Sequence, residues 1–191
     1  MPERLFAPPE GQFPAGAVCR RSARPGYQPA LRPSPSTASG RDLSLPRRYW
    51  VLGLTMAETL ALLFPHVAIS GELTVRAAVS YLPEQSAPDQ NRWFWSYHVR
   101  IENGGERTVQ LLERYWKIVD GRGNVHEVRG QGVVGEMPVI TAGDSYDYVS
   151  GCPLDTSAGS MGGHYMFVDE DGERITAEIP EFALLSPLER S

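Results

Sequence analysis

The feature that most restricts the fold of this chain is a strict alternation between bulky apolar and polar side chains. In one segment the apolar residues recur at every second position, as Trp93, Trp95, Tyr97, Val99 and Ile101. An earlier segment, 73–81, alternates in the same way. Because successive side chains of a strand point to opposite faces, the alternation predicts two β-strands, each with one face in a core.

Turn signals follow at short intervals. They are rich in Gly, Pro, Asn and Asp and occupy residues 83–89, 103–105, 120–123, 142–144 and 169–172. Between them we expect short strands near 108–119, 124–129, 139–140, 146–150, 165–168 and 174–179, and a longer loop over 152–163. No helical period separates these segments. The pattern therefore predicts an all-β fold, an antiparallel β-sandwich of about seven strands.

The beginning of the chain has a different composition, because nine of the 16 prolines lie in residues 1–46. Such a segment cannot bury enough apolar surface to offset the entropy of ordering it. We therefore predict a disordered Pro/Arg-rich arm over 1–46, a short helix or linker over 47–66, and one β-sandwich domain over 67–191.

Charge divides near the same boundary. Residues 1–66 carry eight arginines and four acidic groups, whereas residues 67–191 carry ten basic and 19 acidic groups. An acidic domain repels a phosphate backbone, so we expect no nucleic-acid binding through the domain. The arginines of the arm are scattered among prolines, which favours a solvated linker over a nucleic-acid or membrane tail.

The cysteine content and the hydropathy bear on the compartment. Cys19 and Cys152 form neither a disulfide framework nor a metal-binding pair, which favours a reducing cytoplasm. The most apolar stretch, 49–70, is interrupted by Glu58 and Pro65, so we expect no membrane span and a cytoplasmic location.

The N-terminal part allows two alternatives to a linker. Arg47-Arg48 precedes an apolar stretch and resembles a twin-arginine export signal, although the long preceding arm argues against it. Alternatively, translation begins at Met56.

The sequence offers no pattern for catalysis or for a metal centre. The chain has four histidines, His66, His98, His126 and His164. None of them has acidic or cysteine companions at ligand spacing. No GxSxG motif is present, and neither Ser150 nor Cys152 has a His or Asp arrangement beside it. We therefore expect a protein that is not an enzyme and has neither a metal nor a cofactor.

Residues 130–135 match the pattern GxGxxG, which in a βαβ unit lets the backbone approach a pyrophosphate. Here Pro138 and two β-branched residues follow instead of a helix, which argues against a dinucleotide fold. One remaining interpretation is that the glycines permit a bulge or a positive φ at a sheet corner. A second is an anion nest of backbone N–H groups, with the candidate ligand loop Arg129, Gly130, Gly132 and Gly135.

Alternation sends Phe94 to the face opposite the core residues of its strand, together with His98 and Arg100. An outward aromatic ring beside an arginine suits a protein-binding face. Alternatively, a neighbouring loop covers Phe94.

Five separated segments resemble the ApaG domain family in order and spacing, namely 81–86, 92–97, 109–118, 128–138 and 179–182. The resemblance covers residues 67–189 and implies a sandwich of the immunoglobulin or fibronectin type III kind. Bacterial ApaG proteins are associated with diadenosine-tetraphosphate and divalent-cation phenotypes, whereas similar eukaryotic domains look like protein-interaction modules.

The function that this resemblance implies is a non-enzymatic adaptor that binds an unknown protein partner. The alternative is a sensor that uses the glycine-rich loop. Its ligand would be a phosphate-containing small molecule, such as pyrophosphate or a diadenosine polyphosphate, or its action would be linked to a divalent cation.

Overall fold

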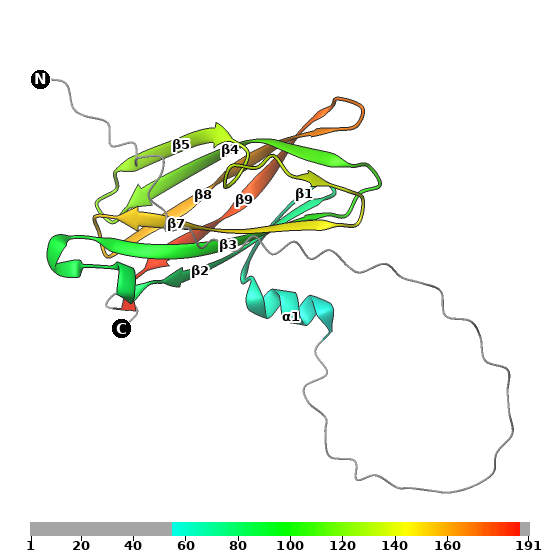
Figure 1. Ribbon diagram of the computed structural model, residues 1–191. Helices are drawn as coiled ribbons and strands as arrows, with labels where there is room; N and C mark the ends of the chain where they lie inside the picture. Colours follow the sequence, from blue (N-terminus) through cyan, green and yellow to red (C-terminus); the bar gives the residue numbers. More distant parts are fainter. Residues whose placement is uncertain (1–54, 188–191) are drawn as a thin grey trace, which may run out of the picture. The chain divides into compact units, whose positions relative to one another are not determined.

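The computed structural model describes residues 55–187, in which one α-helix precedes nine β-strands (Figure 1). Their bounds are α1 Met56–Leu63, β1 His66–Ser70, β2 Leu73–Tyr81, β3 Trp93–Asn103, β4 Val109–Asp120, β5 Val125–Gln131, β6 Val139–Ile140, β7 Ser145–Leu154, β8 Ala158–Asp169 and β9 Arg174–Leu185. Two short 3₁₀ turns, Pro83–Gln85 and Pro88–Gln90, connect β2 to β3. The predicted arm, 1–46, lies outside the described residues.

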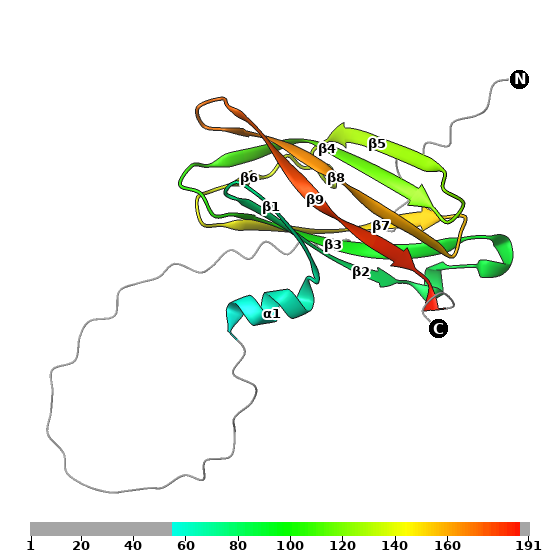
Figure 2. The same cartoon turned by 180° about the vertical axis from the view of Figure 1, so that it is seen from behind.

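The strands form two antiparallel sheets that pack face to face (Figure 2). One sheet has the order β1-β2-β3-β7, and the other has the order β5-β4-β8-β9, with β6 also paired to β4. The prediction of an all-β antiparallel sandwich is therefore confirmed. Among the described residues, no helix is both long enough and apolar enough to cross a membrane.

The core lies between the sheets and follows the alternation seen in the sequence. Buried and half-buried residues alternate along the whole of β3, so that Trp95, Val99 and Ile101 are completely buried. The ring of Tyr97 contacts Trp116 of the facing sheet, with 5.2 Å between the ring centroids. Large aromatic rings thus fill the space between the sheets, which stabilises the fold through buried apolar area.

Helix α1 is short but well capped. The Thr55 and Glu58 side chains form a capping box, and the helix ends before Pro65. The C-cap residue, Phe64, is buried and packs edge-on against the His98 ring of β3, at 4.7 Å between centroids. The predicted short helix is present, and its C-cap lies against the outer face of the four-stranded sheet.

The predicted loop over 152–163 is wrong, because β7 continues to Leu154 and β8 begins at Ala158. The glycines of this segment suggested a loop, but they lie inside strand β8, where the neighbouring strand approaches closely. A side chain at Gly163 would collide with the carbonyl oxygen of Tyr115, and one at Gly159 would collide with that of Val119.

Strand β1 is not predicted by the sequence pattern, and its burial explains why. Its large residues Val67 and Ile69 point outward and are exposed, whereas the small Ala68 points toward the interior. The alternation of this strand is therefore the reverse of that of a half-buried strand. With β1 and the longer β7 and β8, the sandwich has more strand than predicted.

Candidate functional site

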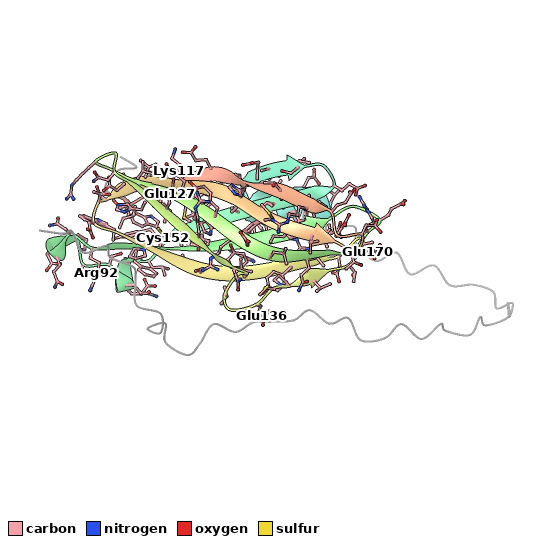
Figure 3. The ribbon with its side chains drawn as sticks, turned by 90° about the horizontal axis from the view of Figure 1, so that it is seen from above. Arg92, Lys117, Glu127, Glu136, Cys152 and Glu170 are labelled. Atoms are coloured by element: carbon pink, nitrogen blue, oxygen red, sulfur yellow. The ribbon has the colours of Figure 1, made fainter. Side chains whose placement is uncertain are left out.

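The glycine loop, defined here as residues 130–138, comprises the end of β5 and the connection from β5 to β6. Val133 and Glu136 exchange backbone hydrogen bonds of 2.8 and 3.0 Å, so that Val134 and Gly135 form a two-residue turn. Both have positive φ, 51° for Val134 and 79° for Gly135, as a type I′ turn requires. The Glu136 side chain projects outward from the loop (Figure 3) and accepts a hydrogen bond from the hydroxyl of Tyr146 at 3.1 Å.

Arg114 of β4 holds the loop from below. Its Nη1 donates hydrogen bonds to the carbonyl oxygens of Gln131 and Gly132, at 2.8 and 2.7 Å. The guanidinium lies directly against Gly130, where an added Cβ would be 3.0 Å from its atoms. The missing side chain of Gly130 thus leaves room for the arginine.

Two further contacts fix the loop to the sandwich. The amide of Gly132 donates to the Leu112 carbonyl at 2.8 Å, and a Cβ at Gly132 would collide with the Glu136 carbonyl oxygen. The Val133 side chain is buried within the core cluster. Backbone bonds, a guanidinium and a buried side chain together make the loop rigid.

These contacts leave little of the loop for an anion. The amides of Gly132, Val133 and Glu136 already donate to backbone carbonyl oxygens. Arg129 points to the outer sheet face, where it lies 4.5 Å from the Tyr115 ring centroid and 3.5 Å from the Glu127 carboxylate. The structure thus brings the three predicted glycines together in one loop but places Arg129 apart from it.

Sequence reasoning missed Arg114, the residue that organises the loop. A signal was present, because Arg114 occupies a core-facing position of β4 directly opposite Gly130 of β5. The bulge at Leu112 shifts the phase of β4 by one residue, which hid this relationship from the alternation pattern.

The glycine loop and its junction with β6 expose three apolar side chains. Val134 is 54% exposed, Met137 is 46% exposed and Val139 is 60% exposed. They stand close together in the sequence on a segment whose backbone is held in place. This group is called the loop patch below.

The second predicted site, the outer face of β3, is closed by contacts within the domain. Arg100 pairs with Glu102 at 2.9 Å and with Asp147 at 2.6 Å, and His98 contacts Asp147 at 3.0 Å. Phe94 is half-buried, and its ring lies over Gly151 of β7, where a side chain would collide with it. The structure does place Phe94, His98 and Arg100 on one face, but each already has intramolecular neighbours.

Buried hydroxyl and thiol groups lie in the core behind the loop. Burial raises the pKa of Tyr97 to about 12 and that of the Cys152 thiol to about 12. The hydroxyl groups of Tyr148 and Tyr165 are hydrogen-bonded to each other, and burial raises the pKa of both. All four groups therefore stay protonated at neutral pH. Within residues 55–187, no group of three His, Cys, Asp or Glu side chains is arranged to hold a metal ion.

Comparison with known proteins places these features in a family. Residues 83–169 match the model of the ApaG domain. Protein ApaG of Brucella canis is 50% identical over 123 residues, which cover 64% of this chain and 95% of that protein. Protein ApaG of Afipia carboxidovorans is 49% identical over 120 residues, which cover 63% and 92%.

A solved structure, described as the putative ApaA protein from Bordetella pertussis, is 45% identical and superposes with a TM-score of 0.59 over 60% of this chain and 94% of that chain. The family model and the curated relatives name the same family. The chain belongs to the ApaG family.

Proposed function

We propose that this protein is a non-enzymatic protein-binding adaptor and that it presents the loop patch to its partner. The observation that carries the proposal is the conformation of Val134. A β-branched residue at positive φ is strained. A glycine at position 134 would remove this strain, but the glycine of the turn is the next residue, Gly135. Strain of this kind is tolerated where the side chain has a use, and here the side chain is exposed to solvent.

The rigidity of the loop supports the same function. Binding costs less free energy when the contact residues are already held in the bound conformation. Arg114 and the buried Val133 hold the backbone before the turn, and the paired backbone hydrogen bonds of Val133 and Glu136 close it, so little order has to be gained on association. Exposed apolar side chains on a fixed backbone suit a protein interface, and methionine is among the residues enriched there.

The alternative, a small-anion sensor at the same loop, has less support from the geometry. An anion nest needs several free N–H groups that point at one place. Three amides of the loop donate to the protein's own carbonyl oxygens instead. The nearest guanidinium, that of Arg114, also donates to the loop's carbonyl oxygens.

A site-specific crosslinking experiment tests the proposal. The full chain would carry photoreactive p-benzoylphenylalanine in place of Met137, and be irradiated in extract of the source cells. Leu62 of α1 is a matched exposed apolar position at 70% and serves as the control site. We expect one discrete adduct from position 137 that is absent from position 62.

The crosslinked partner would then be purified and titrated with the full chain. The variant Val134→Asp places a carboxylate in the apolar contact. It should weaken binding at least tenfold, about 1.4 kcal/mol or more. Val67→Asp, on exposed β1, should leave binding unchanged. Equal binding by the wild type and Val134→Asp would remove the loop patch from the interface, and identical adducts from both crosslinking sites would contradict specific binding.

A further inference from the structure

The connections at one end of the sandwich form a cluster of negative charge. Residues 71–72, 104–108, 141–144 and 169–173 lie at this end, because the strand register places Leu73 opposite Asn103, Glu102 opposite Ser145 and Val109 opposite both Ile140 and Asp169. These connections hold seven carboxylates and one arginine. They are called the acidic end below, and Glu170 marks it in Figure 3.

The opposite end is nearly balanced in charge. Its connections, 82–92, 121–124 and 155–157, hold three carboxylates and two arginines, and Arg92 marks this end in Figure 3. The charge of the domain is therefore unevenly distributed along the sandwich. An uneven field of this kind steers an oppositely charged partner to one end.

The single arginine of the acidic end is already neutralised. Arg107 Nη1 lies 2.6 Å from the buried Asp169 carboxylate, 3.1 Å from that of Asp171 and 3.6 Å from that of Glu173. Arg107 is thus a structural cation inside the cluster. The other four carboxylates of the acidic end form no ion pair with Arg107.

A pocket of about 220 Å³ opens at the acidic end. Its apolar wall is formed by Leu73, Val109 and Ile175, and Glu72, Asn103 and Arg107 contribute its polar groups. Asn103 is fully committed, because its amide binds the Arg107 and Ile140 carbonyl oxygens and the Gly105 amide.

Glu72 differs from the other polar groups of the pocket. Its side chain is exposed, and within the described part of the chain no cation forms an ion pair with it. The carboxylate lies against Gly105, where an added Cβ would collide with it. An apolar wall with one unpaired carboxylate is complementary to a side chain that has an aliphatic stem and a cationic head.

We propose that the acidic end binds a basic segment of the partner protein, with a lysine or arginine side chain inserted in the pocket and its cationic head at Glu72. This inference rests on the proposed adaptor function and names the chemistry of the partner. The stem packs on the half-buried Ile175, and the head meets Glu72 with the field of the surrounding carboxylates behind it. The apolar wall accommodates the aliphatic stem, and the negative charge selects a positively charged partner.

Fluorescence anisotropy of the full chain with labelled model peptides tests the inference. The probes are (Ala-Lys)₅, (Ala-Glu)₅ and a peptide in which 2,4-diaminobutyrate, with a shorter stem, replaces each lysine. We expect the lysine peptide to bind, the glutamate peptide not to bind, and the short-stem peptide to bind more weakly. Raising the salt from about 0.05 to 0.5 M should weaken the binding through screening.

Matched variants locate the binding site. Glu72→Gln keeps the shape and removes the charge, so binding of the lysine peptide should weaken about tenfold. Glu84→Gln, at the opposite end, should change it less than twofold. Equal weakening by both variants, equal binding of the short-stem peptide, or no binding would overturn the inference.

Two further outcomes are informative. Displacement of the peptide by Mg²⁺ at constant ionic strength, with saturable Mg²⁺ binding lost in Glu72→Gln, would assign the site to a cation and overturn the inference. The adaptor function is judged separately by the crosslink from position 137. A specific crosslink there, without any binding of the lysine peptide, would reject the acidic end alone.

Discussion

Arg107 Nη1 lies 2.6 Å from Asp169 Oδ2, and the Asp169 side chain is completely buried. The other carboxylate oxygen accepts hydrogen bonds from the amides of Asp171 and Glu173, at 3.0 and 2.8 Å. Arg107→Gln leaves a buried carboxylate without its cation. Because the arginine is 42% exposed, we expect a loss of about 1–3 kcal/mol in the free energy of unfolding, measured by urea denaturation.

The double variant Arg107→Gln/Asp169→Asn is the control for this prediction. It removes both charges, so it should recover part of the stability lost in the single variant. A single variant as stable as the wild type would show that solvent compensates Asp169 without the arginine.

The glycines of the loop should differ sharply in their tolerance of alanine. Gly132→Ala combines a positive φ of 56° with a collision against the Glu136 carbonyl oxygen. An added Cβ at Gly135 would meet no atom within 4 Å. Gly135→Ala therefore costs only the strain of an alanine at positive φ, about 1 kcal/mol. Urea denaturation should therefore show a clearly larger loss for Gly132→Ala, and equal losses would contradict the rigid-loop description.

Val134→Gly should separate stability from function. The glycine adopts positive φ without strain, so we expect the free energy of unfolding to rise by about 1 kcal/mol, less the entropy that glycine gains in the unfolded chain. Binding of the crosslinked partner should weaken at the same time. A variant that is less stable than the wild type would show that Val134 packs favourably in the folded protein.

Small phosphorylated anions should not bind the loop. Isothermal titration of the full chain with pyrophosphate, ATP and diadenosine tetraphosphate, with and without magnesium or cobalt, should give no saturable heat, because the loop's amides are committed to carbonyl oxygens. Saturable heat that disappears in a folded Arg114→Met variant would instead favour the sensor alternative.

The domain should lose stability in alkali. Burial raises the pKa of Tyr97 from 10.0 to about 12 and that of Cys152 from 9.0 to about 12. Both groups ionise more readily in the unfolded chain. Their contribution to the free energy of unfolding is therefore complete below pH 9 and is lost as the pH rises toward 12. Urea titrations between pH 7 and 11 should show this decline.

Cys152→Ala removes one of these groups and provides the control. It should flatten the decline that begins near pH 9, and Tyr97→Phe should flatten the decline above pH 10. An unchanged pH dependence in both variants would assign the alkaline loss to other groups.

The sequence predicted those strands in which burial follows side-chain size. Strand β3 is the clearest case, because all its large apolar residues except Phe94 point inward. Strand β1 reverses this rule, since Ile69 is 73% exposed, and no local pattern separates it from an exposed connection. The prediction failed at the glycines of β8 for a related reason. These glycines allow a neighbouring strand to approach closely, and that strand is distant in the sequence.

The candidate site was predictable only in part. The sequence placed Gly130, Gly132 and Gly135 at a sheet corner, and this interpretation of the motif agrees with the structure. The contribution of Arg114 depends on a register between β4 and β5 that includes a bulge. Pairing across strands sets that register, so the pattern within any single segment does not reveal it.

The hydrogen bonds of Arg114 have a consequence for colloidal behaviour. Strand β5 is the outermost strand of its sheet, and an outermost strand with free carbonyl groups is a template on which another chain can add. The guanidinium occupies the carbonyl oxygens of Gln131 and Gly132, where β5 ends. The same arginine that shapes the loop thus protects this boundary of the sheet from self-association, so its loss would favour aggregation of a folded domain.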